Sequence, residues 1–195
     1  MRLKTKVKVG NITNLSDARY CAGMGVDLLG FPIGNSEGEI SIETFKEIAE
    51  WVAGPEFILE LSDTIDHALL QKVTQMESIK HIQLNMDQFK SLGSSQQGKS
   101  LIVLTNLNEW KLRHNELKKE TIAYLIIEDK KLIWDEIEVI NKAIPVIVPH
   151  SHLPADTDPS QFPIAGIALE GTNEDKPGQK DYDHLAEVLE MLEVD

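Results

Sequence analysis

Acidic side chains that directly follow short apolar runs are the residues of this 195-residue chain that could do chemistry. Glu128 follows the apolar run that ends at Ile127, and Glu170 follows the one that ends at Leu169. Two neighbouring carboxyl groups push their pKa values apart, so that one holds a proton while the other is ionised. If these runs end side by side, Glu128 and Glu170 form a carboxylate pair suited to acid–base chemistry.

Two histidines offer a different chemistry. His150 and His152 are separated by one residue, and with a nearby carboxylate they could hold a divalent metal ion. The H-x-H spacing is a weak signal, because no H-x-x-x-H or C-x-x-C motif accompanies it. A third interpretation treats these acids and histidines as solvated loop residues of an acidic protein. We expect no cofactor and assign no metal ligands.

A lysine shares a face with the end of the first β-rich segment. Lys8 precedes Gly10 by two residues, so both lie on one face if the segment is a strand. Inside a folded core, a lysine could serve as a base, anchor an anion, or pair with an interior acid. The sequence leaves these roles open.

These residues need a scaffold that brings distant segments together, and short β-rich runs indeed alternate with amphipathic helical stretches. The expected strands are Lys4–Val9, Val26–Phe31, Glu56–Leu61, Ile79–Leu84, Leu101–Leu104, Ile122–Ile127, Pro145–Val148 and Ile164–Leu169. The expected helices run from Asn14 or Ser16 to Gly23–Gly25, and over Ser41–Ala53, Thr64–Met76, Asp87–Leu92, Asn108–Lys119, Leu132–Lys142 and Asp181–Leu192. Residues 149–163, which include four prolines, are expected to form a loop with at most one short helical turn.

Strands separated by helices form right-handed parallel crossover units. Eight such units predict an α/β fold, a single (β/α)8 TIM barrel that spans residues 1–195. An open doubly wound sheet is the alternative, but no G-x-G-x-x-G turn follows the first strand. In the barrel, the residues that follow the strands gather at one end, the mouth. They are Gly10, Asn11, Glu60, Asn85, Thr105, Asn106, Glu128, Asp129, His150, His152 and Glu170.

Composition narrows the classes of partner. The chain has 32 acidic and 19 basic side chains, a net charge of −13, with no basic stripe, so we expect no nucleic-acid partner and no membrane partner. The single cysteine, Cys21, excludes an internal disulfide, and the N-terminal segment lacks the apolar stretch of a signal peptide. We therefore expect a cytoplasmic protein that binds a small molecule at the barrel mouth. The sequence does not set an oligomeric state.

Several motifs resemble those of phosphoribosylanthranilate isomerase, a barrel enzyme of tryptophan biosynthesis. That family reads K-I-C-G-I-T, then N-x-x-D-A, then G-A-D-x-x-G-F near its N-terminus. The matching residues here are Lys8, Ile12, Thr13, Asn14, Asp17, Ala18, Gly25, Asp27, Gly30 and Phe31. Further matches are Ser36 with Ile40–Ser41, Gln83–Leu84, and near the C-terminus Glu174, Pro177, Gly178, Lys180 and Asp181. The resemblance covers nearly the whole chain and implies the same barrel.

The resemblance also implies where catalysis would occur. The family catalyses an Amadori rearrangement of a phosphoribosylamine, with a cysteine base after the first strand and an aspartate acid after the sixth. Gly10 stands at the cysteine position, and Glu128 stands at the aspartate position. Glycine has no group that can accept a proton, whereas glutamate keeps the carboxyl group. We therefore expect Glu128 as the catalytic residue and doubt that the family's isomerase activity is retained.

The positions that bind substrate in the family differ as well. Asn11 stands at a glycine, Asn85 at a histidine, and Glu170 and Gly171 at two serines, while His150 lies in the loop after the seventh strand. Barrels of this kind carry phosphate on backbone N–H groups of the last two strand loops, where Glu170 would repel it. The residues expected to bind the ligand are Lys8, Gly10, Asn11, Asn85, His150, Glu170 and Gly171.

Two hypotheses follow. In the first, the chain is a diverged sugar-phosphate isomerase with Glu128 as its acid. In the second, it is a repurposed or non-catalytic barrel that binds a non-phosphorylated ligand, a metal ion or a protein partner.

Overall fold

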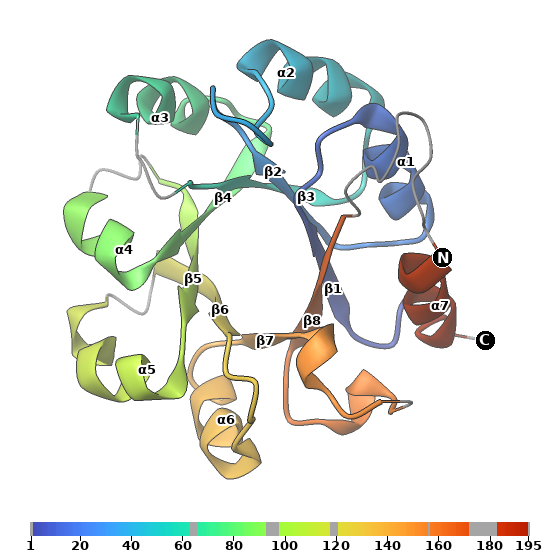
Figure 1. The fold of residues 1–195 in the computed structure, drawn as a ribbon, viewed down its shortest axis with the longest axis vertical. Coiled ribbons are helices and arrows are strands. Elements are labelled where there is room, and N and C mark those ends of the chain that lie inside the picture. The colour runs from blue at the N-terminus through green and yellow to red at the C-terminus, as the bar shows by residue number, and fades with distance from the viewer. Residues whose placement is uncertain are drawn as a thin grey trace.

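A closed barrel of eight parallel strands, surrounded by helices, forms the structure (Figure 1). This computed structural model describes residues 2–62, 66–92, 98–117, 121–155, 157–171 and 183–194. The strands follow one another around the barrel in chain order, and the last pairs with the first in parallel register, from Lys6 beside Gly166 to Gly10 beside Glu170. The predicted (β/α)8 fold is therefore confirmed.

The strands and helices alternate along the chain (Figure 1). The strands are β1 (Lys6–Gly10), β2 (Leu28–Pro32), β3 (Glu56–Glu60), β4 (Ile79–Asn85), β5 (Ser100–Thr105), β6 (Ile122–Ile127), β7 (Val146–Pro149) and β8 (Gly166–Glu170). The helices are α1 (Leu15–Gly23), α2 (Ile42–Trp51), α3 (His67–Thr74), α4 (Met86–Leu92), α5 (Leu107–Arg113), α6 (Trp134–Asn141) and α7 (Asp183–Met191). Short 3₁₀ turns are η1 (His114–Glu116), η3 (His150–His152) and η4 (Pro159–Gln161).

Side-chain caps explain where several helices begin. The Asn14 side chain accepts a hydrogen bond from the Asp17 N–H, and this contact selects Asn14 over Ser16 as the start of α1. Ser41 caps α2 and Asn106 caps α5 in the same way. Such caps satisfy backbone donors that have no partner within the first helical turn. The short loops between strand ends and helices are therefore fixed by local sequence.

Some predicted bounds need correction. The segment after β7 contains two 3₁₀ turns, η3 and η4, rather than at most one, because prolines start turns of this kind without needing a backbone donor. The charged helix expected from Asn108 ends at Arg113 and continues as η1. The predicted beginning of α3 at residue 64 and the family-like motif at residues 174–181 lie outside the described residues.

Apolar side chains fill the middle of the barrel. Five side chains from five different strands form one cluster and are fully or almost fully buried. They are Leu28, Ile58, Ile102, Ile126 and Ile147. A larger apolar layer lies between the strands and the surrounding helices. Within the described part of the chain, every helix falls short of the length and apolar character that a bilayer crossing requires.

The floor of the barrel, at the beginning of the strands, is polar. The His81 ring lies between two partners, with Nε2 2.8 Å from Glu56 Oε2 and Nδ1 2.7 Å from Ser100 Oγ. Beside them, the Lys6 ammonium lies 3.4 Å from Asp27 and 5.9 Å from the centre of the Tyr124 ring. These polar groups of the floor pair with one another.

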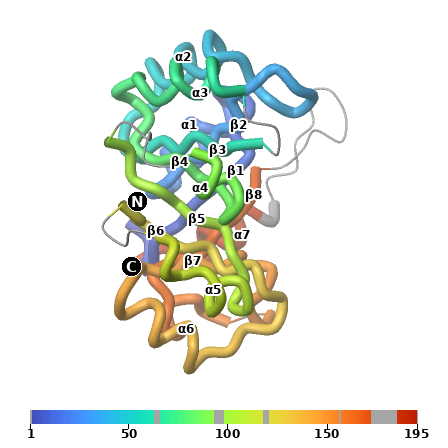
Figure 2. Tube along the Cα trace, turned by 90° about the vertical axis from the view of Figure 1, so that its left-hand side faces the viewer, coloured from blue at the N-terminus to red at the C-terminus, as the bar shows by residue number. Residues whose placement is uncertain are grey.

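The two ends of the described chain meet beside the floor. The Lys4 N–H donates to the Leu192 carbonyl at 2.8 Å, and Leu3 forms a β-bridge with Glu193. Figure 2 shows both ends on the same side of the barrel. These contacts hold α7 against the beginning of β1.

The close approach of β8 to β1 can be tested at Gly166. A Cβ at this position would overlap the Lys6 carbonyl oxygen, a backbone atom that cannot move without disturbing the barrel register. We expect Gly166→Ala to lower the free energy of unfolding by about 1–3 kcal/mol in a urea titration. The control is Gly23→Ala at the end of α1, where nothing lies within 4 Å of the added Cβ. Equal unfolding free energies for the two variants would contradict this packing argument.

Candidate functional site

A cavity of about 420 Å³ opens at the mouth of the barrel. Its wall includes the last residues of β1, β3 and β8, namely Gly10, Glu60 and Glu170, together with Glu128, which follows β6. The complete wall consists of Lys8, Gly10, Asn11, Glu60, Gln83, Leu104, Ile126, Glu128, Pro149, Ser151, Ala168, Leu169, Glu170 and Leu185. Barrel enzymes place their ligands at this end because every strand contributes a loop to it.

A second cavity, of about 270 Å³, lies between the segment after β2 and helix α3. Its two carboxylates both bind the backbone. Glu39 accepts from the Ser36 N–H at 2.7 Å, and Asp66 caps α3 by accepting from Ala68 and Leu69. This cavity therefore offers packing rather than chemistry, and we place the functional site at the barrel mouth.

The structure brings most of the predicted site residues to the mouth cavity. Lys8, Gly10, Asn11, Glu128 and Glu170 line it directly. Gly171 lies just behind the wall, and its N–H donates to the Gly10 carbonyl at 2.8 Å, tying the end of β8 to the end of β1.

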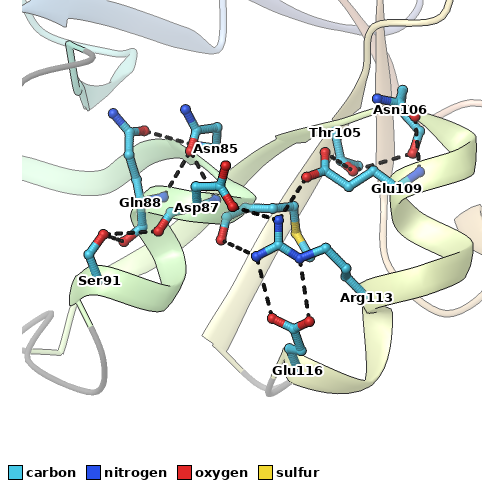
Figure 3. Close-up of polar contacts among 10 residues, drawn as sticks. Asn85, Asp87, Gln88, Ser91, Thr105, Asn106, Glu109, Arg113 and Glu116 are labelled. Atoms are coloured by element: carbon cyan, nitrogen blue, oxygen red, sulfur yellow. Dashed lines mark hydrogen bonds and ion pairs between the residues drawn. The ribbon is translucent and has the colours of Figure 1, made fainter.

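Two predicted residues have other positions. Asn85 is absent from the cavity wall, and its Oδ1 accepts from the N–H groups of Asp87 and Gln88, at 3.1 and 2.8 Å, at the start of α4 (Figure 3). His150 begins the turn η3 and also lies off the wall, whereas the next residue, Ser151, is part of it.

Lys8 forms a buried ion pair with Glu60. Its Nζ lies 2.6 Å from Glu60 Oε1, and the two side chains are only 5% and 14% exposed. Glu60 Oε2 accepts a hydrogen bond of 2.8 Å from the Asn11 N–H, so both carboxylate oxygens have partners. Of the three roles that the sequence left open for Lys8, the structure shows pairing with an interior acid.

Two glycines make room for this ion pair. The Glu60 side chain extends from β3 across Gly30 of β2 to the space above Gly10 of β1. A Cβ at Gly10 would lie 2.6 Å from Glu60 Oε1 and 2.7 Å from Lys8 Nζ, and a Cβ at Gly30 would overlap the Glu60 carboxylate. The place where a side chain at position 10 would begin is thus occupied by the ion pair.

The backbone at the end of β1 has an unusual conformation. Asn11 has a φ of +55°, in the left-handed region that asparagine tolerates better than most residues. The bond from its N–H to Glu60 holds this turn on one side. On the other side Gly171 is close, since a Cβ there would lie 3.0 Å from the Asn11 carbonyl oxygen. Glu60 and Gly171 together fix the shape of this part of the wall.

Glu128 is a wall carboxyl group whose surroundings favour the protonated form. Partial burial beside the barrel wall raises its pKa, because the charged form loses hydration. His152 acts in the opposite direction, the negative charge of Glu170 raises the pKa further, and Lys8 lowers it. Both carboxyl groups line the same cavity, and the carboxylate pair inferred from sequence stays a prediction.

The histidine interpretation receives no comparable support. Among the residues that the structure describes, no three His, Cys, Asp or Glu side chains stand close enough to hold a metal ion. His152 influences Glu128 through its charge, while its Nδ1 is buried and lacks a hydrogen-bond partner. We therefore treat His152 as part of the electrostatic surroundings of Glu128.

Gln83 is a wall residue that the sequence reasoning missed. Its Oε1 is buried and has no hydrogen-bond donor. A buried acceptor of this kind costs free energy until a donor reaches it. The sequence does contain a signal for Gln83, a polar residue within an apolar strand and two positions before the end of that strand. Alternate strand residues share one face, so Gln83 lies on the same face as the last residue of the strand. The prediction considered the residues that follow each strand, and Gln83 lies within one.

A polar network lies next to the mouth, around Arg113 (Figure 3). This guanidinium contacts Asp87 at 2.8 Å, Glu109 at 3.0 Å and Glu116 at 3.4 Å. Glu109 in turn accepts from the Thr105 hydroxyl at 3.2 Å, at the end of β5, and its charge contributes to the raised pKa of Glu128. The charge of Arg113 is thus balanced by α4, α5 and η1.

Several solved structures with the same fold are phosphoribosylanthranilate isomerases. One, in complex with reduced 1-(o-carboxyphenylamino)-1-deoxyribulose 5-phosphate, has a TM-score of 0.71 and 16% identity, over 96% of this chain and 98% of its own. The Thermotoga maritima structure has a TM-score of 0.69 and 17% identity, over 96% of each chain. The Pyrococcus furiosus structure has a TM-score of 0.65 and 17% identity, over 96% of this chain and 98% of its own. No protein-family model and no curated protein matches the sequence. At these identities the likeness establishes the fold.

The electrostatic coupling of Glu128 to Glu170 predicts a measurable pKa change. Because the Glu170 charge raises the pKa of Glu128, Glu170→Gln should lower it, as followed by NMR titration of the Glu128 side-chain carboxyl carbon. The matched control is Glu138→Gln on α6, an exposed residue paired with Lys142, which should leave the Glu128 titration unchanged. An unchanged Glu128 pKa in the Glu170 variant would show that the two carboxyl groups do not interact.

The raised pKa also sets the sign of a stability effect. The folded protein holds the Glu128 proton more tightly than the unfolded chain does. Its contribution to stability is therefore present below the unfolded-state pKa and is lost as the pH rises through the folded-state pKa. Glu128→Gln should remove this part of the pH dependence in urea unfolding measured across that interval, and an identical profile for the variant would contradict the assignment.

Proposed function

We propose that this chain is a phosphoribosylanthranilate isomerase-like barrel whose mouth binds a small, non-phosphorylated molecule that donates hydrogen bonds. Within this site Glu128 exchanges a proton with the ligand, and the Amadori isomerisation is not the activity of the chain. The supporting observation is the charge of the cavity wall. Of the described residues that line it, Lys8 alone is positive, and Glu60 neutralises it at 2.6 Å.

The acidic side chains of the wall disfavour phosphate. Glu128 and Glu170 are acids, and Gln83 presents an acceptor without a donor. Two like charges about 4 Å apart repel by roughly 4 kcal/mol at the effective dielectric near a protein surface. Where such barrels commonly bind phosphate, at the last two strand ends, this chain places Pro149, which has no N–H, and Glu170. A ligand with ammonium or hydroxyl donors fits this wall better than a phosphate ester.

The chemistry of the family reaction also lacks one of its groups. The resemblance places a base at Gly10, which cannot accept a proton, and the ion pair of Lys8 with Glu60 occupies the space above it. Glu60 is a poor substitute as a base, since both its oxygens already have donors. Glu128 retains a carboxyl group with a raised pKa, which suits a general acid. The site thus supports proton transfer at one position and no complete isomerase pair.

The competing interpretations fare less well. The described residues offer no group of three His, Cys, Asp or Glu side chains for a metal ion. The cytoplasmic location and the absence of nucleic-acid and membrane partners stay predictions from composition.

Growth and ligand screening together test the proposal. Expressed in a tryptophan auxotroph that lacks the isomerase, the chain should fail to restore growth, with a bona fide isomerase as the positive control. In a thermal-shift screen, non-phosphorylated amines and polyols should include stabilising ligands, whereas sugar phosphates should not. A ligand at about 100 times its Kd adds roughly 2.7 kcal/mol of stability.

Matched variants locate the binding. Glu128→Gln should abolish or weaken stabilisation by a hit, while Glu138→Gln on the outer surface of α6 should retain it. Restored growth, or stabilisation by sugar phosphates that depends on Glu128, would overturn the proposed function.

A further inference from the structure

We propose that Glu60 is the specificity-determining residue of the mouth, because it occupies and neutralises what would otherwise be an anion-binding position made by Lys8 and the Asn11 N–H. This inference rests on the proposed function, since it explains how the site would come to reject phosphorylated ligands. It assigns to one side chain a role that neither the family resemblance nor the wall composition identifies.

The geometry around Glu60 is that of a bound anion. Its two oxygens meet two different donors, the Lys8 ammonium at 2.6 Å and the Asn11 N–H at 2.8 Å. An ammonium and a backbone N–H that converge on one carboxylate are the donor set with which proteins hold carboxylates and phosphates. In this chain the Glu60 carboxylate occupies the position that a bound anion would take.

The donors are held in place by the surrounding backbone. Lys8 extends from β1, and its side chain is only 5% exposed, so its ammonium has little freedom to turn toward solvent. The Asn11 N–H is directed by a left-handed turn with a φ of +55°, against which Gly171 packs. Removal of the Glu60 carboxylate takes away one support of the Asn11 turn, but the Gly171 contact and the burial of Lys8 remain and should keep both donors near their positions.

The volume that Glu60 occupies is bounded by glycines. Neither Gly10 nor Gly30 could carry a Cβ without meeting the Glu60 carboxylate. Truncation of Glu60 leaves these two positions without side chains, and a space next to the main cavity becomes available. The loss of the carboxylate also leaves Lys8 buried without a counter-ion, a state that costs free energy until an anion enters.

The test is anion binding by a truncated variant. Glu60→Ala should bind acetate, inorganic phosphate and ribose 5-phosphate at least about tenfold more tightly than the unaltered chain, which is the worth of one charge-assisted hydrogen bond. Isothermal titration calorimetry measures the affinities, and thermal shift confirms stabilisation. In Lys8→Met/Glu60→Ala, the gain should disappear because the ammonium is gone.

The matched control separates this role from net charge. Glu170→Ala removes one negative charge from the same wall without releasing Lys8, so its gain in anion affinity should be smaller than that of Glu60→Ala and should not depend on Lys8. Equal gains in the Glu60 and Glu170 variants would overturn the inference and leave the proposed function standing. An unchanged anion affinity in a folded Glu60→Ala chain would also overturn the inference and leave the proposed function standing.

Two further measurements test the inference without relying on Glu60→Ala. Glu60→Gln keeps the side-chain volume and serves if Glu60→Ala does not fold, and its freed ammonium should again favour anions in a Lys8-dependent manner. In the unaltered chain, phosphate should leave the Lys8 ammonium resonance unshifted in NMR. A shift of that resonance would overturn both the inference and the proposed function, because phosphate would then reach Lys8 despite Glu60.

Discussion

A lysine inside a barrel must find a counter-charge, and the way Lys8 finds one shapes the whole mouth. Its partner Glu60 lies 52 residues further along the chain and reaches it across an intervening strand. The pairing leaves no room for a side chain at Gly10 or Gly30, and it holds Asn11 in its left-handed turn. Burial of two charges is tolerable because both Glu60 oxygens accept hydrogen bonds, one from Lys8 and one from the Asn11 N–H. The arrangement of Gly10, Asn11 and Gly30 around the ion pair meets this need for space and hydrogen-bond partners.

The molecule divides its polar residues between two ends with different tasks. At the floor, His81, Glu56 and Ser100 satisfy one another, as do Lys6 and Asp27. At the mouth, the Lys8–Glu60 pair is closed in the same way, but Glu128, Glu170 and Gln83 still face a cavity. Between the ends lies an apolar layer that contributes packing and no chemistry. The wall therefore has an excess of acidic over basic side chains, and this imbalance is the basis of the proposed function.

The likeness to phosphoribosylanthranilate isomerases is a likeness of the scaffold. The barrel is shared over 96% of the chain at 16–17% identity with the three structures compared above. A barrel supports many reactions because its strand-end residues can change while its core is kept. Here the position above Gly10, where the resemblance expects a thiol, holds a carboxylate and an ammonium. Such an exchange alters the charge at the mouth without disturbing the apolar layer beneath it.

The order of strands and helices, the closed barrel and the strand-end location of Glu128 and Glu170 were all predictable from the sequence. These depend on local signals such as periodicity, glycine stops and the Asn14 cap, which neighbouring residues express in any context. The partner of Lys8, the capping role of Asn85 and the unsatisfied acceptor of Gln83 were decided by the tertiary structure. Each depends on which side chains meet across strands or on how the next helix begins. The sequence does not show which charged residues, far apart along the chain, come into contact once the barrel closes.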